Sequence, residues 1–439
     1  MNPEPIFGLN FSGIAVVTDD GRSLSYAELK RATEEWEPQL PRRSLVFLLV
    51  ENNLESLVAY VACLNRGIVP LMLSAQIDQE HLQRFVNAYK PVYVYNLANG
   101  SGSFLNADSP LLHDELALLI TTSGSTGSPK LVRQSYKNIA ANAASIIEYL
   151  ELDETERPIT TLPMNYVYGL SIINTHLKVG ATLLLTKRGI MEREFWNFFD
   201  DQQATSFGGV PYTYEMLDRL MFFRRRLPSL RTMTQAGGKI TPELHRKFAE
   251  YAAKEGKKFV VMYGAAEATS RMAYLPPERA LEKVGSMGIP IPGGRFEIEE
   301  GELVYFGENV TLGYAESACD LAKGDERRGC LFTGDMARVD DDGYYYVIGR
   351  KKRFLKIFGN RISLDETERL IKGKFSGIDC ACVGSDDHMK IYIAGTALPS
   401  EIRKFVAEKT NLNLAAFDVA SIENIPKNDS GKTLYAELG

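Results

Sequence analysis

SLVFLLVENNLESLVAYVACLNRGIVPLML, at residues 44–73, holds two apolar runs on either side of an amphipathic segment. The runs at 44–50 and 68–73 are almost continuously apolar, as strands buried on both faces of a sheet are. Between them, at 52–67, apolar residues recur every three or four positions, which is the spacing of one helix face. The stretch therefore predicts a strand–helix–strand unit with parallel strands.

The same alternation of apolar runs and helical spacing continues toward the C-terminus. Apolar runs predict strands at 91–96, 116–122, 181–186, 204–211 and 258–264, and helical spacing predicts helices that include 191–203 and 242–256. Parallel strands of this kind are covered by helices on both faces. We therefore expect an α/β fold with a large N-terminal body of parallel, helix-covered sheets.

Beyond Val284 the pattern changes to short strands joined by glycine turns. GRFEIEE (294–300), GELVYFG (301–307) and MARVDDDGYYYVIG (336–349) predict a small antiparallel β unit.

A basic run, GRKKR at 349–353, follows this unit. The segment after it has the length and the strand and helix patterns of a small α+β domain. The sequence thus predicts a body at 1–348, a connecting segment at 349–353 and a C-terminal α+β domain at 354–439.

Composition limits the class of protein. The 439 residues are too many for one ordinary hydrophobic core, so two or three domains are expected. A net charge of −6 gives no polybasic surface that would indicate a nucleic-acid partner. The five cysteines are scattered rather than arranged as a disulfide framework, and no leader peptide or run of eighteen apolar residues is found. We expect a soluble, cytoplasmic protein with no nucleic-acid or membrane partner.

A loop rich in glycine and hydroxyl groups follows one predicted strand. In LLITTSGSTGSPK (118–130) the strand ends at Thr121 and the loop closes at Lys130. Its glycines allow backbone N–H groups to turn inward, its Ser and Thr residues add hydroxyls, and the lysine adds charge, which together suit a phosphate. The Walker spacing GxxxxGK[ST] is absent, which disfavours a P-loop kinase. We interpret the segment as a phosphate loop rather than a flexible polar turn.

This loop resembles the phosphate loop of the adenylate-forming superfamily, which includes acyl-CoA synthetases, luciferases and peptide-synthetase adenylation domains. Segments similar to other motifs of the superfamily follow in the same order: YGAAE at 263–267, GELVYFGENVTLGY at 301–314, FTGDMARVDDDGYYYVIGR at 332–350 and IPKNDSGK at 425–432. The order of the motifs makes a chance match improbable. The chain is identified as a compact, stand-alone member of this superfamily.

The resemblance assigns roles in nucleotide binding. Glu267 is similar to the superfamily's magnesium ligand, and Asp335 to the residue that holds both ribose hydroxyls. Tyr263 is similar to the residue that stacks on adenine. The implied ATP-binding residues are Thr122, Ser123, Gly124, Ser125, Thr126, Gly127, Lys130, Gly237, Gly238, Tyr263, Gly264, Ala265, Ala266, Asp335, Ile348 and Arg350.

Two lysines of the last segment resemble catalytic lysines. Lys432 in IPKNDSGK matches the lysine that bridges acid and phosphate oxygens during adenylation, and Lys356 in KKRFLKIFG matches one used on the opposite face of the small domain. The superfamily rotates that domain between its two half-reactions, so 349–353 is expected to be a hinge with Lys352 at the hinge position. The resemblance therefore implies that 354–439 is a mobile lid domain.

The acid pocket departs from the familiar pattern. Ala266 stands where the YGxTE motif has Thr, and Tyr166 in LPMNYVYG (162–169) stands where many acyl-CoA ligases have His. The same segment lacks the Asp with which many amino-acid-activating domains hold the substrate ammonium, so a plain carboxylic acid is favoured. The residues expected to line the pocket are Tyr166, Gly169, Phe207, Val210 and Gln235.

The resemblance implies ATP-dependent activation of a carboxylic acid to acyl-AMP with pyrophosphate release, followed by acyl transfer to a thiol. The implied cofactors are ATP, Mg²⁺ and either coenzyme A or a phosphopantetheine carrier protein, and the sequence leaves the acceptor open. Two alternatives also stay open. One is adenylation alone, with transfer by another protein. The other is an inactive nucleotide-binding homologue, for which Ala266 is the hint.

Overall fold

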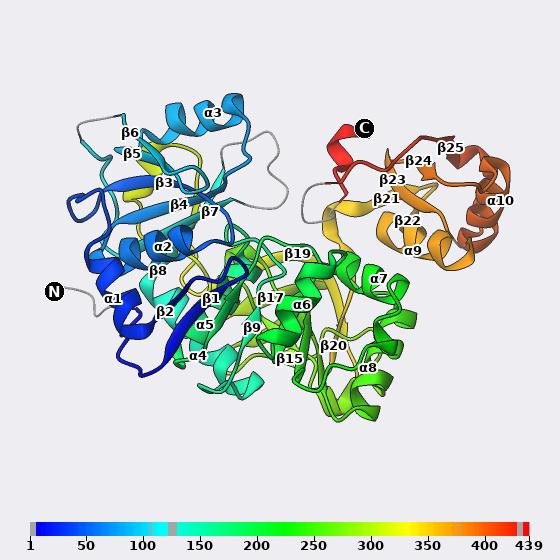
Figure 1. Ribbon diagram of the computed structural model, residues 1–439. Helices are drawn as coiled ribbons and strands as arrows, with labels where there is room; N and C mark the ends of the chain where they lie inside the picture. Colours follow the sequence, from blue (N-terminus) through cyan, green and yellow to red (C-terminus); the bar gives the residue numbers. More distant parts are fainter. Residues whose placement is uncertain (1–5, 106–107, 122–129, 376, 428–432, 439) are drawn as a thin grey trace. The chain divides into compact units, whose positions relative to one another are not determined.

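The computed structural model describes residues 6–105, 108–121, 130–375, 377–427 and 433–438 (Figure 1). The chain divides into two compact units, one comprising Met1–Arg295 and Tyr305–Leu331 and the other Phe296–Val304 and Phe332–Gly439. The hinge at 349–353 stays a prediction. Within the described ranges, no helix is both long enough and apolar enough to cross a membrane.

One sheet of the first unit follows the order β18-β8-β7-β4-β3-β5-β6. Its central strands β7, β4, β3 and β5 are parallel, and the strands at its two edges pair antiparallel. The strands are β3 (Leu45–Val50), β4 (Val69–Ser74), β5 (Tyr93–Asn96), β6 (Ser101–Phe104), β7 (Leu116–Thr121), β8 (Leu131–Ser135) and β18 (Gly313–Ala315). The predicted phosphate loop therefore connects two antiparallel strands, β7 and β8, rather than a strand and a helix.

A second sheet follows the order β15-β14-β13-β12-β11-β9-β10-β1-β2. Its strands from β13 to β1 are parallel, and β2, β14 and β15 are antiparallel. The strands are β1 (Ile14–Thr18), β2 (Ser23–Ser25), β9 (Pro158–Ile159), β10 (Leu183–Leu185), β11 (Ser206–Gly209), β12 (Thr232–Gln235), β13 (Lys258–Tyr263), β14 (Ala273–Tyr274) and β15 (Ile289–Pro290).

The helices of this unit cover the sheets on both faces, as their apolar patterns require. In β3, Val46 and Leu48 join the core that α2, α4 and α5 share with the second sheet, whereas Leu45 and Phe47 pack against α3 on the other face. Asn53 accepts a hydrogen bond from the Ser56 N–H and caps α2. The helices are α1 (Tyr26–Glu34), α2 (Leu54–Arg66), α3 (Gln79–Tyr89), α4 (Tyr136–Leu150), α5 (Val167–Lys178), α6 (Arg193–Asp201), α7 (Pro211–Arg219) and α8 (Pro242–Lys254).

The remaining sheets belong mostly to the second unit. One follows the order β16-β17-β19-β20, with strands β16 (Arg295–Glu299), β17 (Glu302–Phe306), β19 (Cys330–Val339) and β20 (Tyr345–Arg350). The C-terminal part contains the hairpin β21 (Phe354–Ile357) and β22 (Asn360–Ser363), a sheet of β23 (Asp379–Ser385), β24 (His388–Ala394) and β25 (Phe417–Ser421), and helices α9 (Leu364–Lys374) and α10 (Pro399–Thr410). The predicted α/β body, antiparallel β unit and C-terminal α+β part are thus confirmed.

Candidate active site

The YGAAE segment begins where β13 ends, and the close approach of the Ser270 backbone leaves room only for glycine at Gly264. A Cβ atom on Gly264 would lie 1.6 Å from the backbone oxygen of Ser270, so every other residue is excluded there. Further along the loop, Thr269 has a φ of +60° and Ser270 a φ of +143°. Such conformations cost about 1–3 kcal/mol each and persist only when the surroundings fix them.

The side chain of Asn309 fixes this loop from across the unit. Its Nδ2 donates to the backbone oxygens of Ala268 (2.9 Å) and Arg271 (2.8 Å), and its own backbone oxygen accepts from Thr269 Oγ1 at 2.7 Å. Asn309 is buried and accepts a hydrogen bond from Tyr305. The loop between β13 and β14 is therefore held in one conformation before any ligand arrives.

Glu267 lies in this loop and is oriented by Tyr314, the last residue of the GELVYFGENVTLGY motif. The Tyr314 hydroxyl donates to Glu267 Oε1 at 2.6 Å, and the backbone oxygen of Glu267 accepts from both the N–H and the Oγ1 of Thr311 at 3.0 Å. Burial, reinforced by the nearby carboxylate, raises the pKa of Tyr314 to about 12, so the hydroxyl keeps its proton and remains a donor.

The second carboxylate oxygen of Glu267 has no hydrogen-bond partner among the described residues. Mg²⁺ is commonly held by one or two carboxylates together with substrate phosphates rather than by a cage of protein ligands. In the described ranges, no three His, Cys, Asp or Glu side chains gather as a metal cage. A single oriented carboxylate therefore fits magnesium that arrives with a nucleotide.

Two cations lie on the ring of Tyr314. Lys130 Nζ is 3.8 Å from the ring centroid, and the Arg327 guanidinium carbon is 4.6 Å from it. Lys130 comes directly after the predicted phosphate loop and lies 3.8 Å from Glu316. The buried Arg327 Nη1 has no partner among the described residues. Glu267, Lys130 and Arg327 thus surround Tyr314 with the charges that a magnesium-bound phosphate group would need.

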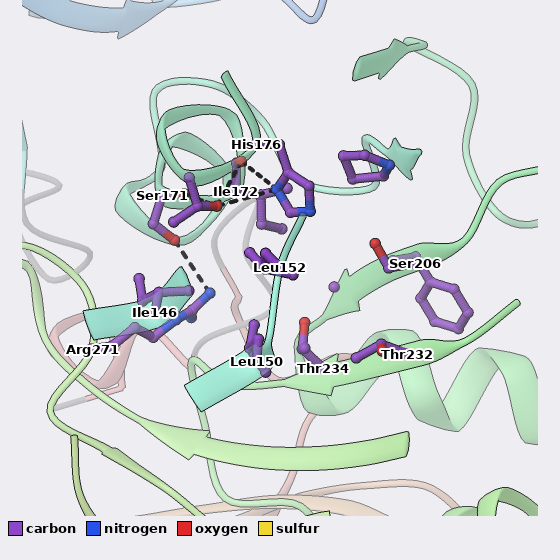
Figure 2. A pocket seen from close by; sticks show the side chains of 14 residues that line it. Ile146, Leu150, Leu152, Ser171, Ile172, His176, Ser206, Thr232, Thr234 and Arg271 are labelled. Atoms are coloured by element: carbon purple, nitrogen blue, oxygen red, sulfur yellow. Dashed lines mark hydrogen bonds between the residues drawn. The ribbon is translucent and has the colours of Figure 1, made fainter. Parts of the chain in front are cut away.

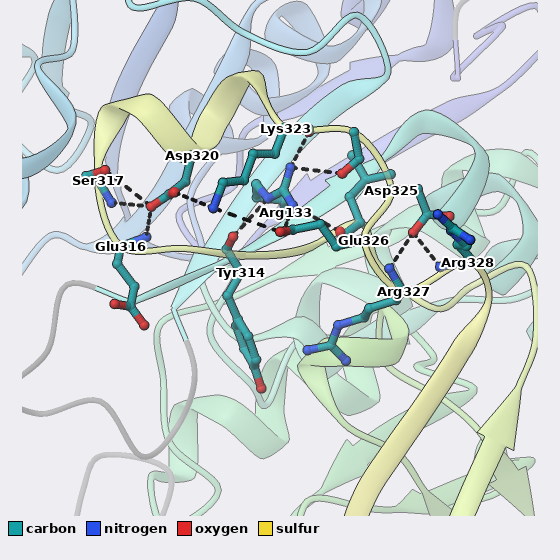
Figure 3. Close-up of polar contacts among 12 residues, drawn as sticks. Arg133, Tyr314, Glu316, Ser317, Asp320, Lys323, Asp325, Glu326, Arg327 and Arg328 are labelled. Atoms are coloured by element: carbon teal, nitrogen blue, oxygen red, sulfur yellow. Dashed lines mark hydrogen bonds and ion pairs between the residues drawn. The ribbon is translucent and has the colours of Figure 1, made fainter.

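A buried arginine holds the segment that carries Tyr314 (Figure 3). Arg133 on β8 is 0% exposed, pairs with Glu326, and donates to the backbone oxygens of Tyr314, Leu312 and Lys323. Figure 3 shows the Tyr314 side chain pointing away from this network. Arg133 therefore fixes the backbone and leaves the ring to contact the other charges.

The Tyr314→Phe variant is expected to lower ATP-dependent acid activation about tenfold and to raise the magnesium concentration needed for half-maximal rate. It removes the hydrogen bond to Glu267, and hydrogen bonds to charged groups contribute about 1.5–3 kcal/mol. The backbone should stay in place because Arg133 binds it. A magnesium titration of pyrophosphate exchange measures the effect, and an unchanged titration curve would mean that Tyr314 does not orient Glu267.

The segments predicted to contact adenine lie at the carboxyl ends of two neighbouring strands. β12 and β13 are parallel neighbours, with Gln235 paired to Val261. Gly237 and Gly238 come just after β12 and Tyr263 is the last residue of β13, so all three lie at the carboxyl ends of adjacent strands. Ligands of open α/β sheets bind at such ends. Gln235 is fully buried, and its Nε2 donates to the Gly238 backbone oxygen at 2.9 Å, so it holds the glycine turn.

The predicted residues of the second unit lie on its strands. Asp335 on β19 is buried and pairs with Arg350 on β20, whose Nε is 2.7 Å from Asp335 Oδ1. Ile348 is exposed on β20. Lys356 is exposed on β21 between the buried Leu355 and Ile357, which places it on the outer face of that hairpin.

Several predicted residues lie outside the described residues. These are Thr122, Ser123, Gly124, Ser125, Thr126 and Gly127 of the phosphate loop, and Lys432. The side chain of Lys352 is also not described, and all these assignments stay predictions.

A narrow pocket, part of it open to solvent, lies between α4, α5 and the strands β11 and β12 (Figure 2). Of the five residues predicted to line an acid pocket, Phe207 lies in its wall. Val210 packs in an adjoining core, and Tyr166 packs against that core. Arg271, which the sequence analysis did not single out, also lines this pocket.

Comparison with known proteins agrees with this arrangement. The family model described as AMP-binding enzyme matches residues 97–315. A 2-succinylbenzoate–CoA ligase of Bacillus licheniformis is 27% identical over 434 residues, covering 89% of this chain and 88% of that protein. A feruloyl-CoA synthase of an Amycolatopsis species is 29% identical over 302 residues, covering 64% and 58%.

Solved structures share the fold. O-succinylbenzoate coenzyme A synthetase from Bacillus subtilis, in complex with AMP, is 22% identical and superposes with a TM-score of 0.81, covering 100% of this chain and 96% of that one. MatB from Rhodopseudomonas palustris, bound to ATP, is 20% identical, with a TM-score of 0.79 and coverage of 100% and 98%. With the ordered motifs and the charges around Tyr314, these findings show that the chain belongs to the AMP-binding, adenylate-forming enzyme superfamily.

Proposed function

We propose that the protein is an AMP-forming ligase that activates a carboxylic acid as acyl-AMP and transfers the acyl group to coenzyme A. The observation that carries the proposal is the set of opposite charges around Tyr314: a carboxylate, Glu267, and two cations, Lys130 and Arg327. Relatives that align over most of this chain are named CoA ligases. O-succinylbenzoate coenzyme A synthetase from Bacillus subtilis has been solved in complex with ATP and magnesium ion and in complex with the acyl-adenylate intermediate OSB-AMP.

In the first half-reaction, a carboxylate oxygen of the acid attacks the α-phosphorus of ATP, and pyrophosphate leaves. Two anions must approach each other, so the enzyme has to supply positive charge. We assign Lys130 and Arg327 to the phosphate oxygens, and Lys432 is expected to bridge the acid and the α-phosphate. Magnesium held by Glu267 would neutralise further phosphate charge.

In the second half-reaction, the thiol sulfur attacks the acyl carbon, the bond to AMP breaks, and AMP leaves with its negative charge. We assign Lys356 to this step, since it lies on the exposed face of β21. Asp335 and Arg350 are assigned to the nucleotide, the former to the ribose hydroxyls. Coenzyme A is preferred over a carrier protein because the named relatives use it.

An acid-dependent exchange between ATP and labelled pyrophosphate, run over a library of carboxylic acids, tests the activity. We expect plain acids to support exchange better than the standard α-amino acids, because LPMNYVYG lacks an Asp for an ammonium group. Adding coenzyme A to the best acid should then yield a thioester. Exchange with one proteinogenic amino acid and with no plain acid would contradict the proposal. Acyl-AMP that accumulates in the presence of coenzyme A would indicate adenylation alone.

A further inference from the structure

Arg271 is a fully buried cation in the wall of the pocket shown in Figure 2. It is 2% exposed, and its backbone oxygen is held by Asn142 Nδ2 at 3.1 Å and Asn309 Nδ2 at 2.8 Å. The guanidinium lies 3.8 Å above the ring of Tyr168, and one of its Nη atoms donates to Ser171 Oγ at 3.2 Å. The fixed backbone and the stacked ring together hold the charge in one place.

No carboxylate pairs with this guanidinium among the described residues, and its buried Nε has no hydrogen-bond partner there. Arg133, which is also fully buried, provides the contrast because it pairs with Glu326 and donates to several backbone oxygens. Proteins rarely bury a charge without a counter-charge, since its lost hydration is not repaid. The missing partner of Arg271 is therefore expected to come from a ligand.

The rest of the pocket wall is neutral. Ile146, Leu150, Leu152 and Phe207 form apolar surface. His176 Nδ1 donates to the Ile172 backbone oxygen at 2.7 Å, and burial lowers the pKa of His176 to about 4, so the ring is uncharged near neutral pH. Arg271 is thus the charged group in the described lining of a largely apolar pocket.

The pocket borders the segments assigned to the nucleotide. Arg271 lines the pocket, and a Cβ atom on Gly264 would lie 3.0 Å from Arg271 Cα. The N–H of the next residue, Met272, donates to the backbone oxygen of Tyr263 at 2.8 Å. An acid whose reacting carboxyl faces the α-phosphate would extend its other end into this pocket. That end would meet apolar walls and one fixed cation.

We infer that the acid activated by this enzyme carries a second anionic group, a carboxylate, which pairs with Arg271. The inference rests on the proposed function and names its substrate class, an acid with two carboxylates separated by an apolar spacer. The same cation would repel the ammonium of an α-amino acid. Arg271 is on this account a specificity-determining residue that contacts the part of the substrate that does not react.

The test uses two pairs of acids that differ by one carboxylate: adipate with hexanoate, and 2-succinylbenzoate with 4-oxo-4-phenylbutanoate. The full-length protein should give a higher kcat/KM in pyrophosphate exchange for the diacid of at least one pair. Arg271→Met should lower kcat/KM for that diacid at least about 30-fold, the lower end of the loss when one partner of a buried charge pair is removed, and leave the monoacid nearly unchanged. Arg271→Lys should retain part of the preference, because it keeps the charge but loses the fork geometry.

A matched control is Arg327→Met, which removes a cation assigned to phosphate and should lower exchange with both members of a pair by the same factor. Thermal unfolding gives a readout independent of activity. Without ligand, Arg271→Met should melt at the wild-type temperature or above, because it removes an uncompensated charge. The preferred diacid should raise the melting temperature of the wild type but not that of Arg271→Met.

The outcomes separate this inference from the proposed function. Two results would overturn the inference and leave the ligase activity standing. One is a wild-type kcat/KM for each monoacid that equals the kcat/KM for its diacid. The other is an Arg271→Met variant whose kcat/KM falls by the same factor for both members of a pair. If Arg271→Met does not fold, the inference is tested by the wild-type preference for the diacid and by the reduced preference expected of Arg271→Lys. No exchange with any acid of the library would instead refute the proposed function.

Discussion

Replacing Lys432 with alanine is expected to abolish acid-dependent pyrophosphate exchange while thioester formation from preformed acyl-AMP survives. Lys432 closes the IPKNDSGK motif and is assigned to the charge that develops as the acid attacks the α-phosphate. Removal of one preorganised charge or donor costs about 3–4 kcal/mol of transition-state stabilisation. Exchange and single-turnover thioester assays on the same purified variant, with the acid identified in the screen, measure the two half-reactions separately.

The matched variant is Lys356→Ala, for which the opposite bias is expected. Lys356 is exposed, and its backbone N–H donates to Asp386 Oδ1 at 2.8 Å, so the substitution removes a charge without disturbing the buried neighbours on β21. Lys352→Pro should also spare adenylation and stop transfer, because proline fixes φ at the predicted hinge. Equal losses in both assays for Lys432→Ala and Lys356→Ala would show that the small domain does not alternate between two orientations.

Glu267→Gln is expected to lower adenylation by about 10²-fold or more while the protein stays folded. Glutamine keeps the size of the side chain and can still accept a hydrogen bond from Tyr314, but it lacks the charge assigned to magnesium. The backbone contacts from Thr311 and Asn309 do not involve this carboxylate, so the loop should keep its conformation. Pyrophosphate exchange over a magnesium titration, with circular dichroism as a check of folding, measures the effect.

Glu316→Gln serves as the control for charge alone. Glu316 is an exposed carboxylate 3.8 Å from Lys130, and surface pairs of this kind contribute little. Its exchange rate should stay within a factor of about two to five, since a surface pair is worth roughly 1 kcal/mol or less. If Glu267→Gln exchanges at the wild-type rate at low magnesium, Glu267 is not the metal ligand.

Sequence periodicity predicted best the strands that are buried on both faces and the helices that are buried along one face. β3 and β4 are buried on both faces and therefore read as continuous apolar runs, and α2 between them has the spacing of a single buried face. α5 was not predicted as a helix, because ten of its twelve residues are buried and no polar face marks a helical period. The antiparallel strands at the edges of both sheets were also not predicted. Most of them pair with the strand next to them in sequence, but they have only two to five residues, which is too short to show an alternating pattern.

The candidate site was predicted where a local motif carries it and missed where tertiary packing creates it. Glu267 was found from YGAAE, and Tyr314 stood at the end of a quoted motif without a role until its hydroxyl was seen to meet Glu267. Arg327 lies sixty residues after Glu267 in a segment of alternating charges, so nothing local distinguished it. One feature of the sequence could have identified Arg271: it is the single charged residue in the stretch from Ala268 to Leu275.

The antiparallel pairing of β7 and β8 determines how the enzyme attracts its nucleotide through solution. The first helix after the phosphate loop, α4, begins only after the five residues of β8, which span roughly 17 Å. A helix dipole acts within its first turn and so contributes little at that distance. Under the proposed function, capture of the triphosphate would therefore rely on the phosphate loop and on side-chain cations such as Lys130, whose field is screened over about 8 Å at physiological ionic strength. We therefore expect the nucleotide affinity of this protein to fall more steeply with salt concentration than in proteins that bind phosphate at a helix N-terminus.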